Sequence, residues 1–490
     1  MDRQAYLEQI DQVNRDGHYH PDWDSLASHP IPEWYPQQKF GIFIHWGVYA
    51  VPAFDNEWYS RNMYIRDTKA FEHHVQVYGT QDKFGYKDFI PLFKAEKFDA
   101  TKWASLFKRA GAQYVSPVAE HHDGFQMYKT ELSHWNAMEM GPHRDVLGEL
   151  KVAVENEGMN FCTSSHRVEH WFFMGHGREF DSDVKEPMQL GDFYWPAQPE
   201  ASHVDIFSIP TPTDEFLEDW LLRCCELIDN YRPKALYFDW WIQHNSVKPY
   251  LKRMAAYYYN RAEKWGTGCV IQYKHDAFPF GCAVPDMERG QFADAKPYYW
   301  QSDTSTARNS WCYTENNIYK DTREILWDLI DVVSKNGRLL LNVGPKANGE
   351  IAPQDVKILT EIGDWMVLNS EAIYHTRPWR LSQEGPTLIL EGQFTDGESK
   401  HFTSKDIRYT CNGAHIYATV MQWPEDGTVH LTALGAVEEA KMPPFCGILR
   451  GMEVLGFAGD IQWSRDESAL HILAPFVKSD LPVVLKISID

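Results

Sequence analysis

The fold is indicated most directly by the stretch Ala235-Leu236-Tyr237-Phe238-Asp239-Trp240-Trp241. This short apolar run predicts a buried strand, and it ends in a carboxylate between aromatic residues. Upstream, residues 214–232 carry apolar side chains at helical spacing, and the Arg232-Pro233 pair predicts where that helix ends. A helix, a tight turn, a strand and an acid at its C-terminal end form the layout of a (β/α) barrel, whose active sites lie at that end. Asp239 is therefore a candidate catalytic residue, with a helix cap or a structural ion pair as its alternative roles.

The same alternation of strand and helix continues on both sides of this stretch. Apolar runs predict further strands at 40–47, 114–119, 159–163, 269–274 and 338–345. Amphipathic segments predict helices at 98–112, 145–158, 247–265, 321–334 and 354–370. The segment from Asp286 to Asp303 is predicted to be irregular. Because no glycine-rich phosphate turn follows the first strand, a doubly wound sheet is disfavoured, and we expect an α/β fold, a TIM-like (β/α) barrel with irregular parts.

Beyond Trp379 the pattern changes to short runs separated by turn residues. These runs lie at 387–391, 415–420, 429–432, 470–473 and 483–487. Their spacing is typical of a C-terminal antiparallel β-sandwich. We therefore expect two domains, a catalytic barrel at 1–378 and a β-sandwich at 379–490.

The composition limits the partners. With a formal net charge of −22, the chain would be repelled by nucleic acid and by anionic membranes. Aromatic residues make up 14% of the chain, and their flat faces suit stacking on sugar rings, although large aromatics also fill cores. We expect a neutral substrate, no nucleic acid partner and no membrane partner, and the sequence leaves a homo-oligomer open.

The N-terminus and the cysteines predict a cytoplasmic location. The first eight residues include acids where a signal peptide needs a basic start followed by an apolar run. Across the chain, no apolar run reaches the length of about 20 residues that a membrane span requires. The eight cysteines are scattered without the paired spacing of a zinc site, which favours a reducing compartment.

Polar side chains follow the first two predicted strands. His45 and Trp46 end the first strand, and Glu57 and Trp58 follow in a loop. The second strand leads into the run Glu120-His121-His122-Asp123. Imidazoles donate and accept hydrogen bonds and carboxylates accept them, so such a cluster suits a polar substrate or a metal. The alternatives are a hydrogen-bonded core histidine for His45 and a solvated loop for the second cluster.

Taken together, these strand ends resemble the α-L-fucosidases of glycoside hydrolase family 29. The resemblance spans most of residues 30–475 and is carried by five blocks: Trp34-Tyr35 with Lys39 to Gly47, Glu57-Trp58-Tyr59, His121-His122-Asp123-Gly124-Phe125, Phe238-Asp239, and Asn336-Gly337 through Leu341 to Pro345. The first and third blocks are highly specific, the last moderately so, and Phe238-Asp239 is weak alone. The family's C-terminal sandwich has runs similar to Ile416-Tyr417-Ala418 and Trp423-Pro424.

This resemblance implies an exo-acting retaining glycosidase that hydrolyses terminal α-L-fucosyl residues from glycosides or oligosaccharides by double displacement. It makes Asp239 the nucleophile. It also implies a substrate pocket formed by His45, Trp46, Glu57, Trp58, His121, His122, Tyr237 and Trp311. A retaining mechanism needs a second carboxyl about 5 Å away to protonate the leaving oxygen. An aromatic wall would suit the apolar C5 methyl group of fucose.

Glu288 is the candidate acid/base, since it lies downstream of the 269–274 strand and resembles the version found in part of the family. Its role requires a pKa raised by burial and by the charge of Asp239. A surface ion pair with Arg289 is the alternative role, and Glu57 is the alternative acid. Two stretches, Thr163 to Arg167 and Trp300 to Asp303, depart from the family pattern where we expect the leaving group to bind.

Two other functions remain open at this stage. A metal-dependent barrel hydrolase would use the ligands His121, His122, His166, His275 and Asp239, although the first strand lacks the His-x-His pair of such enzymes. A fucose-binding protein without turnover would keep the pocket but would not need Asp239 with a second acid. We expect no cofactor and no metal, and a fucosylated glycan or glycoside as substrate. The sequence does not determine the fucosyl linkage.

Overall fold

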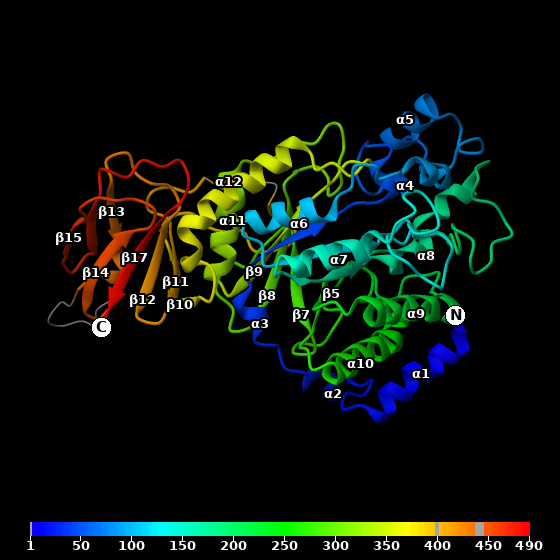
Figure 1. Ribbon diagram of the computed structural model, residues 1–490, viewed down its shortest axis with the longest axis horizontal. Helices are drawn as coiled ribbons and strands as arrows, with labels where there is room; N and C mark the ends of the chain where they lie inside the picture. Colours follow the sequence, from blue (N-terminus) through cyan, green and yellow to red (C-terminus); the bar gives the residue numbers. More distant parts are fainter. Residues whose placement is uncertain (1, 397–400, 437–444) are drawn as a thin grey trace.

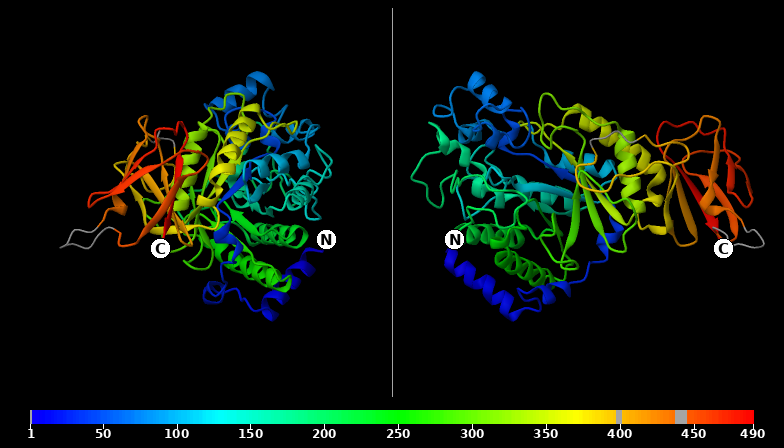
Figure 2. Two further views of the ribbon diagram at one scale, coloured as in Figure 1. Left: turned by 60° about the vertical axis from the view of Figure 1, so that its left-hand side comes forward. Right: turned by 180° about the vertical axis from the view of Figure 1, so that it is seen from behind.

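The computed structural model describes residues 2–396, 401–436 and 445–490. It confirms the predicted fold class, a closed barrel of eight parallel strands followed by a domain of antiparallel sheets. Figure 1 shows the barrel with its surrounding helices, and the C-terminal sheets at one end of the molecule beyond α11 and α12. Both views in Figure 2 show the same separation.

The barrel strands are β1 (Phe40–Ile44), β2 (Tyr114–Glu120), β4 (Thr163–Ser165), β5 (Ala235–Phe238), β6 (Val270–Tyr273), β7 (Val284–Glu288), β8 (Trp300–Ser305) and β9 (Gly337–Val343). A short strand β3 (Asn160–Phe161) pairs with the start of β2, and only Cys162 separates it from β4. Since β1 pairs in parallel with both β2 and β9, the ring of strands is closed.

Helices surround this ring. The larger ones are α6 (Ala100–Arg109), α7 (Val146–Asn156), α9 (Asp214–Tyr231), α10 (Lys248–Lys264), α11 (Thr322–Ser334) and α12 (Pro353–Asn369). The N-terminal helix α1 (Arg3–Asp16) lies against α9 and α10 (Figure 1). Shorter helices are α2 (Trp23–Ala27), α3 (Trp34–Gln37), α4 (Tyr59–Asn62), α5 (Lys69–Val77) and α8 (His170–Phe173). Each predicted barrel helix is present, with ends that differ by a few residues.

The region 286–303, predicted to be irregular, contains part of β7 and of β8, so that prediction was wrong for these strands. Their side chains are polar yet buried, because they bond to one another inside the barrel. Gln301 accepts from the Gln272 amide at 2.6 Å and donates to Asp286 at 2.8 Å. The connections 274–283 and 289–299 contain no helix, so the barrel is irregular on this side.

The C-terminal domain has a five-stranded sheet in the order β10-β11-β12-β17-β14 and a three-stranded sheet in the order β13-β16-β15. The strands are β10 (Arg377–Glu384), β11 (Ile407–Asn412), β12 (His415–Val420), β13 (Thr428–Leu431), β14 (Leu449–Val454), β15 (Gln462–Arg465), β16 (Leu470–Leu473) and β17 (Val483–Ile489). Apolar side chains of both sheets share one core, as in a sandwich. The predicted boundary near residue 378 falls at the start of β10.

The run 387–391 was predicted to be a strand, and this is wrong. It lies in the connection between β10 and β11, where Leu388 is 93% exposed. Its three successive apolar residues imitate a strand, but they pair with no sheet strand: Leu388 and Leu390 are exposed, and Ile389 is buried. The barrel and the sandwich meet where α11 packs on β10 and β11, and the Trp327 indole donates to the carbonyl of Met421 at 2.7 Å.

Among the helices of the described residues, none combines the length and the apolar character that a membrane span requires.

Candidate active site

A cavity of about 490 Å³ opens at the C-terminal end of the barrel strands. This volume is usual for a small-molecule site, and the position is where barrel enzymes bind their substrates. The cavity is lined by aromatic, imidazole and charged side chains: Phe43, His45, Asn56, Glu57, Trp58, His121, His166, His203, Val204, Tyr237, Asp239, Trp240, Lys274, Glu288, Asp303, Trp311 and Phe394.

The reactive side chains lie where the strands end. His45, His121, Asp239 and Lys274 each come directly after the last residue of a barrel strand, β1, β2, β5 and β6 respectively. Glu288 is the last residue of β7. Because the strands are parallel, all these ends meet at one rim, and residues far apart in sequence converge on one cavity.

Two histidines of this rim are neutral. His45 donates from Nδ1 to Oδ1 of Asn342 at 2.7 Å, which leaves Nε2 as the acceptor. His121 lies with its ring stacked on that of His166, 4.8 Å between centroids, and its buried Nδ1 has no hydrogen-bond partner among the described residues. Burial lowers the pKa of His45 and of His121 well below the usual range. Both rings therefore offer uncharged hydrogen-bonding atoms at neutral pH.

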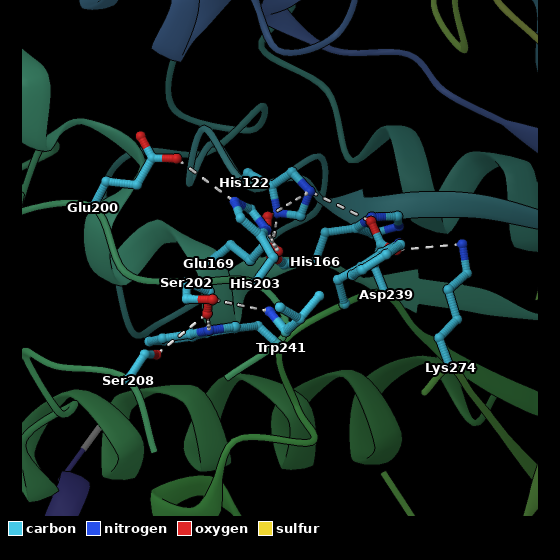
Figure 3. Close-up of polar contacts among 12 residues, drawn as sticks. His122, His166, Glu169, Glu200, Ser202, His203, Ser208, Asp239, Trp241 and Lys274 are labelled. Carbon is cyan, nitrogen blue, oxygen red and sulfur yellow. Dashed lines mark hydrogen bonds and ion pairs between the residues drawn. The ribbon is translucent and has the colours of Figure 1, made fainter. Parts of the chain in front are cut away.

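The two carboxylate oxygens of Asp239 have different surroundings. Its Oδ2 lies 2.9 Å from Nδ1 of His166 and 3.4 Å from Nε2 of His122 (Figure 3). Its Oδ1 accepts no hydrogen bond from the described residues, and Nζ of Lys274 lies 3.4 Å away. Burial alone would raise the pKa of Asp239, but Lys274, His166 and His122 outweigh it and lower the pKa well below the usual range. Asp239 is therefore an ionised carboxylate whose Oδ1 is buried beside Lys274 and accepts no hydrogen bond from the described residues.

Lys274 is a buried ammonium group among acids. Nζ lies 2.6 Å from Oε2 of Glu288, 3.4 Å from Asp239 and 3.5 Å from Asp303. Burial would lower the pKa of Lys274, but Asp303, Glu288, Asp239 and Asp286 together raise it well above the usual range. One cation therefore joins the carboxyl groups of Asp239 after β5, Glu288 at the end of β7 and Asp303 within β8.

Glu288 differs from Asp239 in its protonation. Burial, together with the charges of Asp239 and Asp303, raises the pKa of Glu288 to about 7 against the opposing effect of Lys274. Its Oε2 accepts from Nε1 of Trp240 at 2.5 Å as well as from Lys274. The shared ammonium limits the separation of the two carboxyl groups, since the oxygens that it contacts can be no more than about 6 Å apart.

The opposite wall is formed by Glu57, Trp58 and Trp311. Oε2 of Glu57 accepts from the backbone N–H of Trp311 at 3.0 Å. Burial raises the pKa of Glu57. The centroid of the Trp311 ring lies 5.1 Å from that of His45. The Arg289 guanidinium lies over the Trp311 ring, 4.5 Å from its centroid. This wall combines an acceptor for hydroxyl groups with flat aromatic surface.

A chain of alternating charges leads from Asp239 to the edge of the cavity (Figure 3). Nδ1 of His122 faces the carbonyl of His166, and its Nε2 lies 3.4 Å from both Asp239 and Glu169. Both ring nitrogens thus face acceptors, and the pKa of His122 is raised because these carboxylates outweigh burial. Glu169 in turn lies 3.1 Å from His203. His203 also faces Glu200, at 3.7 Å.

Comparison with known proteins agrees with this site. The model of the family described as alpha-L-fucosidase matches residues 6–371, and the model of the alpha-L-fucosidase C-terminal domain matches residues 400–488. The chain belongs to the alpha-L-fucosidase family. It is therefore a glycoside hydrolase by family.

Individual members of the family are similar over nearly their whole length. The tissue alpha-L-fucosidase of Rattus norvegicus is 29% identical over 489 residues, covering 95% of this chain and 91% of that protein. The tissue alpha-L-fucosidase of Homo sapiens is 30% identical, covering 93% and 88%. The crystal structure of Thermotoga maritima alpha-fucosidase in complex with fucose superposes with a TM-score of 0.73 at 28% identity, covering 96% of this chain and 100% of that one.

Most residues predicted to bind substrate or act in catalysis line the cavity of this family member: His45, Glu57, Trp58, His121, Tyr237, Asp239, Glu288 and Trp311. His122 is absent from the lining and lies behind it, against Asp239. Glu288 does not form the alternative ion pair with Arg289. That guanidinium bonds instead to Asp396 and to the carbonyls of Ala307 and Ser310.

Trp46 lies outside the cavity, so the structure contradicts its predicted role in substrate binding. Its ring packs against Phe93, Phe98 and Trp103, and Nε1 donates to the carbonyl of Lys346 at 2.8 Å. Successive side chains in extended backbone point to opposite sides. Because His45 faces the interior of the barrel, Trp46 faces the surrounding elements.

Several residues of the cavity were missed as site residues, among them Lys274, Asp303, Trp240 and Phe394. For Lys274 a signal existed, since it follows an apolar strand as Asp239 does. The two stretches expected at the leaving-group side each contribute one residue to the cavity lining, His166 and Asp303. His166 bonds to Asp239 and Asp303 lies beside Lys274, whereas Trp300 is buried with its indole on the carbonyl of Lys335.

Two groups of side chains have the proximity of metal ligands: His45, His121 and His166, and His122, His166 and Asp239. Their bonding does not suit a cation. His166 uses both nitrogens, one toward Asp239 and the other, at 2.9 Å, toward the hydroxyl of Ser164. Asp239 already has an ammonium group beside it, which would repel a metal ion. His275, the fifth candidate ligand, lies on the ring of Trp240.

Proposed function

We propose that this family member is an exo-acting retaining α-L-fucosidase, with Asp239 as nucleophile and Glu288 as acid/base. The observation that carries the proposal is the pair of carboxyl groups joined by Lys274, one ionised and one with a pKa raised to about 7. Two neighbouring acids whose environments separate their pKa values are suited to different tasks. Their spacing of no more than about 6 Å between contacting oxygens fits the retaining geometry better than the inverting one.

The glycone is proposed to be a terminal fucosyl residue. The Thermotoga maritima relative, which was solved in complex with fucose, supports this choice. The neutral rings of His45 and His121 can accept hydrogen bonds from sugar hydroxyls, or donate to them, without the cost of burying a charge. Phe43 and Trp311, 6.3 Å apart between ring centroids, give apolar surface for the C5 methyl group.

In the first step, Oδ1 of Asp239 attacks the anomeric carbon while Glu288 donates its proton to the leaving oxygen. The bond from the anomeric carbon to that oxygen breaks, and an ester to Asp239 forms. Oε2 of Glu288 accepts from Trp240 and Lys274, so the transferred proton is carried by Oε1. His166 and His122 hold Oδ2 and keep the carboxylate oriented for the attack.

In the second step, ionised Glu288 takes a proton from water, and the water oxygen attacks the anomeric carbon. The ester bond breaks, and the carboxylate of Asp239 is restored. Lys274 stabilises this departing carboxylate, which helps the second step. Two inversions at the same carbon retain the configuration of the sugar.

The test is a set of two variants assayed with an aryl α-L-fucoside and a fucosylated disaccharide. Asp239→Gly should lower kcat for both by about 10³-fold or more, and azide should restore turnover by attacking in the place of the carboxylate. Glu288→Gln should lose far more activity on the disaccharide, whose leaving group needs the proton. For the wild type, kcat/KM should fall as the pH rises through about 7, because Glu288 then loses that proton.

Nuclear magnetic resonance of the first-formed sugar tests the stereochemistry independently. Retention requires that α-L-fucose appears before mutarotation produces the β form. First release of the β form would contradict the retaining mechanism, and full turnover by Asp239→Gly would remove Asp239 from it. A fucose-binding protein without turnover would bind L-fucose in calorimetry but would hydrolyse neither substrate.

A further inference from the structure

On the Glu288 side, the mouth of the cavity is formed by two aromatic side chains that the proposed mechanism does not use as a surface. Trp240 and Phe394 both line the cavity, with their rings 6.0 Å apart between centroids and inclined by 28°. Nε1 of Trp240 donates to Glu288. The far side of Trp240 is covered by the ring of His275 at 3.7 Å. Trp240 thus adjoins the carboxyl group that faces the leaving oxygen, and the ring of Phe394 lies beside Trp240.

Phe394 belongs to the connection between β10 and β11, which reaches back from the sandwich to the barrel. Its backbone N–H donates to the carbonyl of Glu288 at 2.8 Å. Gly392 donates in the same way to Gln291 at 3.1 Å. A Cβ atom on Gly290 would lie 1.9 Å from the carbonyl oxygen of Gly392, so the segments can approach this closely only because residue 290 is glycine.

The anchor of this segment is Asp396 rather than Phe394. The Asp396 side chain is 9% exposed, and its carboxylate lies 2.6 Å from Nζ of Lys320 and 2.6 Å from the hydroxyl of Thr304 and also contacts Arg289. Its backbone N–H donates to the carbonyl of Arg289 at 2.9 Å. The phenyl ring of Phe394 is not needed for this attachment, since its side chain remains 54% exposed.

Phe394 is held in an unfavourable conformation. Its φ of 57° lies in the left-handed region, which bulky residues seldom adopt. Trp241, His275 and Arg289, which follow β5, β6 and β7, have φ values of 77°, 51° and 44°. Strained backbone that gathers at one rim is typical of functional sites, where the surrounding structure enforces it. An exposed aromatic ring kept in such a position at a cavity mouth therefore points to a ligand.

We propose that Trp240 and Phe394 form the binding platform for the leaving group, and that they favour a leaving group with a ring. The inference rests on the proposed role of Glu288, because the leaving oxygen must come within hydrogen-bond reach of that carboxyl group. The atoms beyond this oxygen then lie over the two aromatic faces. A sugar ring stacks its apolar CH face there, and an aryl group stacks its π face.

The test compares substrates that share fucose and differ in the leaving group. The probes are α-L-fucosyl fluoride, whose leaving group has no ring, 4-nitrophenyl α-L-fucoside and a fucosylated disaccharide. The variant is Phe394→Asn, because asparagine tolerates φ above zero and removes only the aromatic face. The ratio of kcat/KM for each ring-bearing substrate to kcat/KM for the fluoride should fall about three- to tenfold.

Leu390→Ala is the matched control, since Leu390 is 64% exposed in the same connection and lies outside the cavity lining. This control should keep the wild-type ratio. An equal loss on all three substrates in Phe394→Asn would overturn the inference, because the ring would then act on the chemistry and not on the leaving group. An unchanged ratio would overturn it as well. A wild type inactive on all three probes would instead overturn the proposed function, and this inference with it.

Discussion

The two halves of the barrel rim face the same cavity but differ in charge. At the ends of β1, β2 and β4, the titratable side chains that line the cavity are the imidazoles of His45, His121 and His166. On the half formed by β5 to β8, the charged side chains of the lining are Asp239, Lys274, Glu288 and Asp303. On the imidazole half, burial lowers the pKa of His45, His121 and His166, so these rings are neutral. On the other half, Lys274 lowers the pKa of Asp239 and keeps its carboxylate ionised despite burial.

This difference separates recognition from chemistry. Neutral imidazoles exchange hydrogen bonds with hydroxyl groups at any pH near neutrality, so the imidazole half should set affinity. The charged half fixes which carboxyl group is ionised, so it should set the pH dependence of the rate. Substitutions in the two halves should therefore have different kinetic signatures, which makes the comparison testable.

The largest effect is expected for Lys274→Met, which removes the cation and keeps an unbranched side chain only one atom shorter. Without Lys274, burial raises the pKa of Asp239, which must be ionised, and the pKa of Glu288 rises above about 7. Activity at pH 6 should fall about 10²- to 10³-fold. The optimum in a profile of kcat/KM against pH should move to higher pH by one unit or more, on the order of the shifts that one adjacent charge produces.

Lys335→Met is the matched control for losing a buried ammonium group. Lys335 directly follows the last residue of α11 and is fully buried. Its Nζ lies 2.6 Å from the Asp331 carboxylate, and the residue is outside the cavity lining. This variant should lose stability in urea unfolding while its pH optimum stays in place. If Lys274→Met kept the wild-type optimum, charge on this half of the rim would not control the protonation of the acids.

The sequence predicted the imidazole half far better than the charged half. His45 and His121 follow apolar strands and lie in distinctive motifs, so pattern and resemblance agreed. β7 and β8 were missed because their polar side chains bond to one another inside the barrel, which removes the apolar signal of a strand. Glu288 was found only through resemblance, and Asp303 and Lys274 were not recognised as site residues.

Other errors have local physical causes. Trp46 was assigned to the pocket because it stands beside His45 in the motif, although adjacent side chains of a strand face opposite ways. The run 387–391 was taken for a strand because a short apolar run between turn residues does not reveal whether its backbone pairs with a sheet. Phe394 carried no signal, since only the folded chain brings residue 394 to the carbonyl of Glu288.

A smaller effect is expected for His121→Phe in the imidazole half. Phenylalanine keeps the ring that stacks on His166 and removes both nitrogens. The loss of a hydrogen bond to a sugar hydroxyl should lower kcat/KM about 5- to 50-fold. Because His121 is neutral in the working range, the pH profile should keep its shape. A profile displaced as in Lys274→Met would show that the two halves do not act separately.

The smallest effect on turnover is expected for His203→Gln, which tests why an imidazole in the connection between β4 and β5 is protonated although it lines the same cavity. Burial opposes protonation of His203, but Glu169 and Glu200 outweigh it and raise its pKa to about 9. A group with a raised pKa stabilises the fold fully below its unfolded value, about 6.5, and this contribution is lost as the pH rises through about 9. The stability advantage of the wild type over the variant should therefore be about 1–3 kcal/mol at pH 6 and should nearly vanish at pH 10.

Urea unfolding of both proteins at pH 6 and pH 10 measures this difference, while kcat should change only a few-fold, because Glu169 and His122 separate His203 from Asp239. His29 supplies the control of opposite sign. Burial lowers the pKa of His29, so its contribution is present above the unfolded value and is lost as the pH falls through its lower folded value. Of these two histidines, His203 is the one that lies between two carboxylates, Glu169 and Glu200, which favour its protonated form. If the stability differences of His203→Gln and His29→Gln changed with pH in the same way, His203 would not be protonated as these contacts predict.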